Sequence, residues 1–174
     1  MRRKIIPILA ALCLAVLLGT GSYATTVLRF SLEDLVKRSQ FIVVGKVTGE
    51  RTYWTADRKM ILTDHSIEVN ESIKGQASRS MVVTTVGGRM GDTELHVAGM
   101  PTFQKGEDAV VFVEQTGAYR TVVGLGQGKF TVVNGEVVNN VADLSFPDGR
   151  PGNPVRMPLT TFRNQIRNIV NPQP

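Results

Sequence analysis

The chain has 174 residues, of which 20 are Lys or Arg and 15 are Asp or Glu, giving a formal net charge of +5 at pH 7. Three of the basic residues and none of the acidic ones lie in residues 1–24, so residues 25–174 are close to neutral. The other basic residues are scattered singly, a distribution that gives no support to a nucleic-acid or anionic-membrane partner.

Residues 1–24 have the pattern of a secretory signal peptide. Residues 2–4 are basic, Ile5–Leu18 is an apolar core, and Ser22 and Ala24 are the small residues that a signal peptidase requires before its cleavage site. The apolar core is shorter than the roughly 20 residues that span a bilayer. We therefore expect cleavage after Ala24, export to the periplasm or the cell exterior, and no stable membrane anchor afterwards.

Cys13 is the only cysteine in the chain, and it lies within the expected signal peptide. A bacterial lipoprotein carries a small residue before its lipidated cysteine, but Leu12 occupies that position here, so a lipoprotein is not indicated. The processed chain, residues 25–174, has the size of one domain and contains no disulfide. Its stability must therefore come from a packed core.

The predicted elements begin with a helix at about residues 31–39. Ser31 is a suitable N-cap, and Asp34 stands three residues later, as in a capping box. A strand follows at residues 41–48. Gly45 lies within that strand and suggests a bulge.

Residues 52–59 are predicted to be a polar loop. The chain then forms a long strand at residues 61–73, because apolar and polar residues alternate there. A strand at 81–86, a turn at 87–92 and a return arm at 93–97 predict a hairpin.

The centre of the predicted fold follows this hairpin. Gly99 and Pro101 end one strand, Phe103 offers a large apolar anchor, and residues 105–108 form a turn. Ala109–Val113 is apolar at every position, which is typical of a central strand covered on both faces. The other strands are expected to pair with this run or to cover it.

Three more strands are predicted at residues 119–124, 129–133 and 136–139. Asn134 and Gly135 separate the last two and form a strong hairpin signal, because both residues of such a turn adopt positive φ. Residues 142–156 are rich in Pro, Gly, Asp and Asn and predict a surface loop. A helix at about residues 158–170 repeats apolar residues on one face.

These elements predict a mainly β fold with two flanking helices, in one domain that spans residues 25–174. Sequential hairpins indicate an antiparallel sheet, and the long strand pair with its internal glycine favours closure into a small OB-like β-barrel. Strands that are apolar on both faces need cover outside the barrel, which the two helices can supply. The sequence shows no internal repeat and no second domain.

Little in the sequence indicates catalysis. Gly124–Lys129 looks like a phosphate-binding loop, but only three residues separate Gly124 from Gly128, and Phe130 follows the lysine, whereas a Walker loop has four residues there and then Ser or Thr. We interpret it as a connection in which backbones approach closely. Without a Gly-x-Ser-x-Gly elbow, a cysteine in the processed chain or an evident carboxylate pair, we expect a protein that is not an enzyme and has no cofactor.

The two histidines offer the one plausible metal or acid–base centre in the sequence. Glu94 and His96 share a strand face, so they predict a two-ligand half-site that Asp92 or Asp64 would complete. His65 and Asp64 point to opposite faces and do not form a joint pair. The alternative, and our expectation, is that no metal binds, with a partly buried His65 and an exposed His96.

Aromatic and methionine residues in predicted loops are enriched where one protein grips another. The candidates of this kind are Tyr53, Trp54, Met90, Met100 and Phe103. The alternative interpretation is that these side chains fold back onto the core.

The strands at residues 43–47, 72–75, 81–85 and 109–113 resemble those of the netrin-like domain, a group with an OB-type barrel that includes the tissue inhibitors of metalloproteinases. The Gly-x-Pro-x-Phe-x-x-Gly-Glu segment at 99–107 and the Gly-Gln-Gly-Lys-Phe segment at 126–130 resemble a set of uncharacterised exported bacterial proteins. The first resemblance implies a barrel but not the inhibitory mechanism, because the family's N-terminal cysteine is missing from Thr25–Val27.

We therefore expect an exported, non-catalytic domain that binds another exported protein, hypothetically a secreted hydrolase. One alternative is a barrel that binds a saccharide or small molecule, with Tyr53 and Trp54 as its stacking surface. Another is a metal-dependent hydrolase built on Glu94 and His96.

Overall fold

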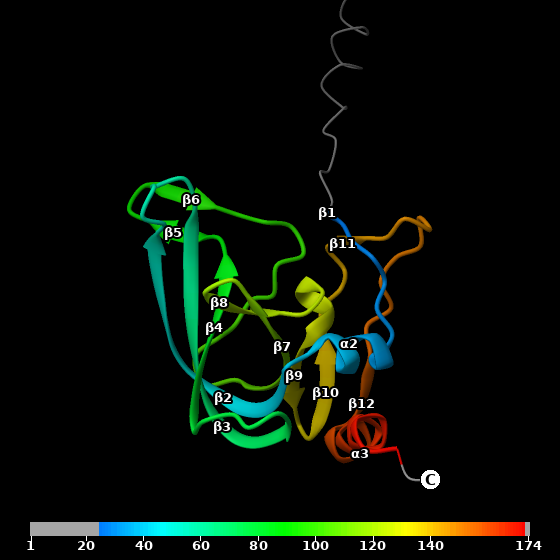
Figure 1. Ribbon diagram of the computed structural model, residues 1–174. Coiled ribbons are helices and arrows are strands. Elements are labelled where there is room, and N and C mark those ends of the chain that lie inside the picture. The colour runs from blue at the N-terminus through cyan, green and yellow to red at the C-terminus, as the bar shows by residue number, and fades with distance from the viewer. Residues whose placement is uncertain (1–24, 173–174) are drawn as a thin grey trace, which may run out of the picture.

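The structure, a computed structural model, describes residues 25–172 (Figure 1). It is mainly β, with a large antiparallel sheet and, within these residues, two α-helices, which confirms the predicted fold class. The expected signal peptide, residues 1–24, lies outside the described residues. Between residues 25 and 172, no helix is both long and apolar enough to cross a membrane.

The helices are α2 (Leu32–Arg38), α3 (Leu159–Val170) and the short 3-10 helix η2 (Leu125–Gly128). The large sheet contains β2 (Phe41–Trp54), β3 (Ile61–Lys74), β4 (Ser80–Val86), β7 (Asp108–Thr116), β8 (Tyr119–Val122), β9 (Lys129–Val133), β10 (Glu136–Asn139) and β12 (Arg156–Pro158). Two small sheets pair β5 (Gly88–Met90) with β6 (Thr93–Leu95), and β1 (Thr25–Thr26) with β11 (Leu144–Ser145).

The strand order of the large sheet is β12-β10-β9-β7-β2-β3-β4, and every pair in it is antiparallel. Strand β7 pairs with β2 along one edge. Its other edge is shared, because residues 108–111 pair with β9 and residues 113–116 pair with β8. Strand β7 is thus the centre of the sheet, as its apolar sequence predicts.

Over the described residues, the sheet does not close into the predicted barrel, because strands β4 and β8 do not pair. The sheet curls until β4 lies beside β8, but no strand pairing between these two occurs in the part of the chain that the structure describes. Side chains line a hollow at this seam instead, among them Val82 and Thr84 from β4 and Tyr119 and Arg120 from β8. The sheet is therefore curled and open, with a hollow lined by side chains at its last seam.

The two faces of β7 belong to two different cores. Ala109, Val111 and Val113 lie in the inner core, enclosed by the curled sheet. Val110 and Phe112 lie in the helix-side core, on the opposite face. All five residues are 0% exposed, so the predicted two-sided cover is confirmed.

The two helices cover the outer face of the sheet, as predicted (Figure 1). Helix α2 begins with the predicted capping box between Ser31 and Asp34. Helix α3 buries Phe162 and Ile166, and the ring of Phe162 lies 4.5 Å from that of Phe130, between centroids. These apolar contacts hold both helices against β7.

Two glycine interpretations are also confirmed. The pairing of β2 with β3 shifts register at Gly45, where an added Cβ would press on the carbonyl oxygen of Glu68. Asn134 and Gly135 have φ values of 51° and 79°, as the β9–β10 hairpin turn requires.

Three local predictions are wrong. Strand β2 continues through Tyr53 and Trp54, which were expected in a loop, since aromatic and β-branched residues favour a strand even in a polar segment. Residues 88–90 form a strand instead of a turn. The predicted surface loop at 142–156 contains β11 and buries Leu144 and Phe146 in a small third core, because isolated apolar residues leave no periodic signal.

Replacing Phe112 with Ala should lower the free energy of unfolding by about 3–5 kcal/mol, because it leaves a cavity between two aromatic rings at the centre of the sheet. Val133→Ala is the matched control: its side chain is 47% exposed, so we expect a change of about 0.5 kcal/mol or less. Urea unfolding followed by circular dichroism measures both. Equal effects of the two substitutions would contradict the central position of β7.

Candidate functional site

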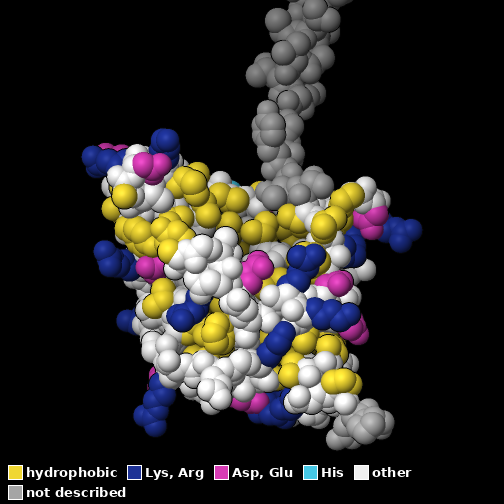
Figure 2. Space-filling view, in the orientation of Figure 1, with side chains coloured by type: hydrophobic (Ala, Val, Ile, Leu, Met, Phe, Trp, Pro, Cys, Tyr) yellow, Lys and Arg dark blue, Asp and Glu magenta, His cyan; other side chains and the backbone are white. Residues whose placement is uncertain are grey.

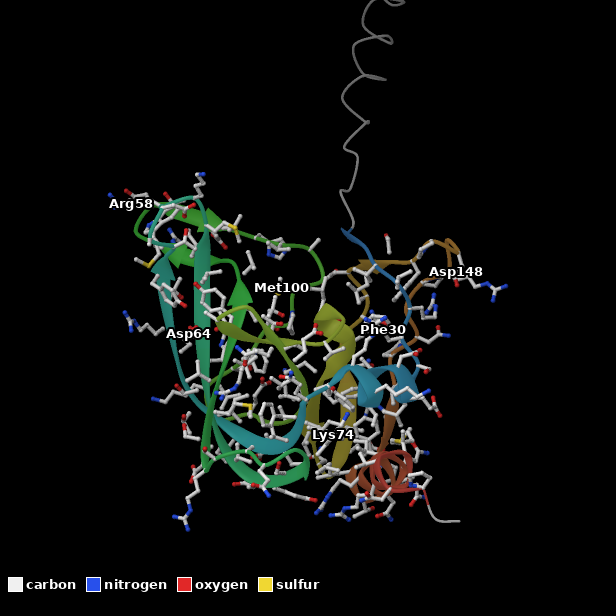
Figure 3. All side chains as sticks on the ribbon, in the orientation of Figure 1. Phe30, Arg58, Asp64, Lys74, Met100 and Asp148 are labelled. Atoms are coloured by element: carbon white, nitrogen blue, oxygen red, sulfur yellow. The ribbon has the colours of Figure 1, made fainter. Side chains whose placement is uncertain are left out.

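The segment 96–104, here called the Met100 loop, follows β6 and separates three hollows. Met100 lines all three and lies near the centre of the view in Figure 3. We name them the apolar hollow (about 440 Å³), the histidine hollow (about 350 Å³) and the lysine hollow (about 260 Å³). The sequence predicted this loop as the connection before β7. In the structure it lies between the three hollows, which together form the candidate site.

The apolar hollow lies at the open seam of the sheet. Its apolar lining comes from five parts of the chain: Val27, Leu28, Phe30, Val86, Met100, Val122 and Leu125. Arg38 and Glu114 are its charged residues. Leu28 is 65% exposed, and Figure 2 shows hydrophobic side chains gathered along this edge of the molecule. Such a gathering on a surface is typical of an interaction site.

The histidine hollow lies on the other side of Met100, which together with Val86 lines both hollows. His65 of β3 forms part of its wall and is 4% exposed. Its Nε2 lies 2.9 Å from Oγ1 of Thr85, and the Thr85 hydroxyl donates to the carbonyl oxygen of Thr63 at 3.4 Å. Because the Thr85 hydroxyl has this acceptor, we assign the imidazole proton to Nε2, which then donates to Thr85.

This arrangement leaves Nδ1 of His65 as an acceptor. Within residues 25–172, no group forms a hydrogen bond with it. Oε2 of Glu50 lies 3.7 Å away, which is too far for a hydrogen bond. The pKa of His65 falls from 6.5 to about 4, mainly because the side chain is buried; Asp64 opposes this shift and Lys129 contributes to it. The imidazole is therefore neutral at neutral pH.

The lysine hollow contains a buried ion pair. Nζ of Lys129 lies 2.8 Å from Oε1 of Glu107 and 2.7 Å from Oγ1 of Thr131. The side chains of Lys129 and Glu107 are only 11% and 12% exposed. The backbone nitrogen of Gly126 also donates to the carbonyl oxygen of Gly99 at 2.9 Å. The segments 99–107 and 126–130, which sequence reasoning treated separately, thus form one junction.

Phe103 connects the histidine hollow to this junction. Its ring centroid lies 4.6 Å from that of His65 and 5.3 Å from Nζ of Lys129. Phe103 is 6% exposed and belongs to the inner core. Phe103 is therefore a core residue that packs beneath the site, and it is not a binding residue exposed on the surface.

The glycine-rich connection behaves as interpreted. Residues 125–128 form η2, and Gly126 approaches the backbone of Asn140 so closely that an added Cβ would lie 2.6 Å from its carbonyl oxygen. Gln127 is buried: its Oε1 accepts from the backbone nitrogen of Phe30 at 2.8 Å, and its Nε2 donates to the carbonyl of Leu28 at 3.0 Å. This side chain fixes the segment that carries Leu28 over the apolar hollow.

Of the five predicted binding residues, the structure brings Met100 and Phe103 to this site. Tyr53 and Trp54 are consecutive in β2 and so point to opposite faces. The hydroxyl of Tyr53 donates to Asp64 at 3.2 Å, in a separate hollow at the β4–β8 seam. Met90 is half-buried in β5.

The predicted metal ligands are only partly brought together. Glu94 and His96 share the histidine hollow, as their spacing predicts, and His96 is exposed. Asp64 instead accepts from Thr84 at 2.7 Å on another face. Asp92 lies in the exposed turn between β5 and β6. Within residues 25–172, no group of three or more His, Cys, Asp or Glu side chains could hold a metal ion.

Thr85, His65 and Glu50 stand in the order of a nucleophile, base and carboxylate, a constellation that sequence reasoning missed. Glu50 pairs directly across from His65 in the β2–β3 ladder, and this was hidden because β2 was predicted to end at residue 48. The Thr85 hydroxyl donates to a backbone carbonyl, Glu50 is too distant to orient the imidazole, and the pKa of about 4 makes His65 a weak base. The geometry of these three residues therefore fits the binding of a hydrogen-bond donor by His65 and Glu50 better than it fits nucleophilic catalysis by Thr85.

Replacing Lys129 with Met should lower the free energy of unfolding by about 3–5 kcal/mol, because Glu107 would be left as an unpaired buried charge. Replacing both residues, Lys129→Met with Glu107→Leu, should recover most of that loss. The exposed pair of Lys46 and Asp108, whose side chains are 45% and 46% exposed, supplies the control, since Lys46→Met should cost about 1 kcal/mol or less. A double substitution that is as unstable as the single one would refute the pairing.

Acidification should destabilise the protein through His65. Its pKa is 6.5 when unfolded and about 4 when folded, so the unfolded state binds the proton more readily as the pH falls from 6.5 to 4. We expect a loss of about 3 kcal/mol over that range, measured by urea unfolding at a series of pH values. His65→Gln should remove this part of the pH dependence, whereas His96→Gln should preserve it. The same slope in both variants would exclude His65 as its source.

Comparison with known proteins found no match: no family model, no curated protein and no solved structure matches the chain. The resemblance to netrin-like domains and to exported bacterial proteins stays a prediction. What the structure does establish is the physical role of the two segments that carry the second resemblance. They meet through the Glu107–Lys129 ion pair and the Gly99–Gly126 hydrogen bond.

Proposed function

We propose that the protein is an exported, non-catalytic module that binds an extended segment of another exported protein across the Met100 loop. The observation that carries this proposal is the continuity of two unlike hollows. The apolar hollow and the histidine hollow lie side by side and share Val86 and Met100.

An extended peptide is the occupant that suits this pair of hollows. Consecutive residues of such a segment present an apolar side chain and polar groups within a few ångströms of each other. The apolar hollow of about 440 Å³ has room for a large side chain. The unbranched, polarizable side chain of Met100 can adjust between the two hollows, as methionines at binding surfaces do.

A saccharide site on Tyr53 and Trp54 has less support. The two rings lie on opposite faces of β2 and do not form one stacking surface. The hydroxyl of Tyr53 is also engaged with Asp64. We therefore place the binding surface at the Met100 loop.

Selection of the purified protein against a displayed library of random decapeptides tests the proposal. We expect the enriched sequences to share a large apolar residue. Leu28→Asp should weaken their binding by about tenfold or more, because a charge would enter the apolar hollow. Leu28 is 65% exposed, so this substitution should leave the fold intact.

Val133→Asp is the matched control for this experiment. Val133 is 47% exposed and lies at the end of β9, outside the lining of the three hollows. Its replacement should leave peptide affinity unchanged. No enrichment, or equal losses from Leu28→Asp and Val133→Asp, would argue against the proposed surface.

A further inference from the structure

We infer that the histidine hollow binds a primary ammonium group, such as a lysine side chain of the bound segment, between Nδ1 of His65 and the carboxylate of Glu50. The choice of a peptide as its carrier rests on the proposed function. The ammonium site itself rests on a separate observation, the unpartnered acceptor of a buried histidine.

The imidazole of His65 forms part of the wall of the hollow, and its Nδ1 is buried without a hydrogen-bond partner among residues 25–172. The Nε2–H group donates to Thr85, which fixes the ring, and Phe103 packs against the imidazole. A buried acceptor without a hydrogen bond is energetically unfavourable, because it has lost its contact with water. The fold retains such an acceptor at Nδ1, in the wall of an open hollow. A ligand that donates a hydrogen bond there would recover that cost.

The second acceptor selects the class of donor. Oε2 of Glu50 lies 3.7 Å from Nδ1, and with the imidazole proton on Nε2 both atoms are acceptors. A hydroxyl has one hydrogen and can satisfy one of them. An ammonium group has three N–H groups on one atom and can donate to both while neutralising the carboxylate.

The charges around the hollow favour a single cation. Its lining includes the carboxylates of Glu50 and Glu94 and one guanidinium, Arg89. Arg89 is exposed, and its Nε donates to the carbonyl of Gly91 in the β5–β6 turn. Lys129 lies behind Phe103, where Glu107 neutralises it. The remaining charge in the hollow is therefore negative.

The rest of the lining suits the aliphatic part of a lysine. The apolar residues Leu95, Val97 and Pro101 form part of the wall of the hollow. Methylene groups of a lysine side chain pack well on such a wall while the charged end reaches polar partners.

Titration with n-butylamine at pH 7, observed at the ring nitrogens of 15N-labelled His65 by NMR, tests the inference. The free protein should show the proton on Nε2. Butylammonium should shift the Nδ1 resonance upfield in a saturable way, and n-butanol at the same concentrations should not. Glu50→Gln should weaken amine binding by about tenfold.

Glu50 is the residue to change because its side chain is 61% exposed, whereas His65 is part of the packed interior. Glu68→Gln is the matched control, since Glu68 is an exposed carboxylate of β3 outside the hollow, and it should leave amine binding unchanged. Three results would each overturn the inference: a proton on Nδ1 in the free protein, no saturable shift, or equal binding of butanol and butylamine. If the ammonium site fails but peptides still bind through Leu28, the proposed function stands. If amines bind saturably but no peptide binds, the ammonium site stands and the proposed function fails.

Discussion

Strand β7 must be covered on both faces, because Ala109, Val111 and Val113 lie in one core while Val110 and Phe112 lie in the other. Burial of this kind dominates the free energy of folding. The helices and the β9–β10 hairpin supply the cover on one side, and the curled strands β2, β3 and β4 supply it on the other. The Met100 loop, which leads into β7, takes part in the same packing because the ring of Phe103 lies in the inner core. Met100 is thereby placed at the surface, between the hollows.

The buried ion pair of Glu107 and Lys129 is positioned by the same strand. Glu107 directly precedes β7, and Lys129 is the first residue of β9, which pairs with β7. A buried pair contributes little net stability, because desolvation offsets the attraction between the charges. We expect the pair to act on specificity instead, because a slipped β7–β9 register would separate two buried charges. The pair thus fixes the junction on which the Met100 loop rests.

Much of the fold was predictable from local patterns. Ser31 and Asp34 mark the start of a helix, Asn134 and Gly135 mark a hairpin, and the run 109–113 marks a central strand, because each signal depends on neighbouring residues alone. The failure of barrel closure was not predictable in this way. It depends on whether β4 and β8, which are distant in sequence, meet by backbone hydrogen bonds or by side chains.

The site was predictable only in part, for the same physical reason. Sequence reasoning named Met100 as a binding candidate and Glu94 and His96 as possible metal ligands. It also named Phe103 as a binding candidate, with packing onto the core as the alternative, and the ring is buried beneath the site. It missed the partnership of His65, Thr85 and Glu50, which requires the correct length and register of β2. It also missed Leu28, whose position depends on the hydrogen bonds of Gln127, about a hundred residues later in the chain.

The most direct measurement of the central claim is a map of backbone and methyl NMR shifts in the purified protein on addition of a selected peptide. The account predicts that the largest changes fall on Leu28, Val86, Met100 and Leu125, with smaller ones at His65, and that helix α3 and the β9–β10 hairpin are unaffected. Changes centred on α3 or on that hairpin would show that the protein binds through another face and would contradict the account.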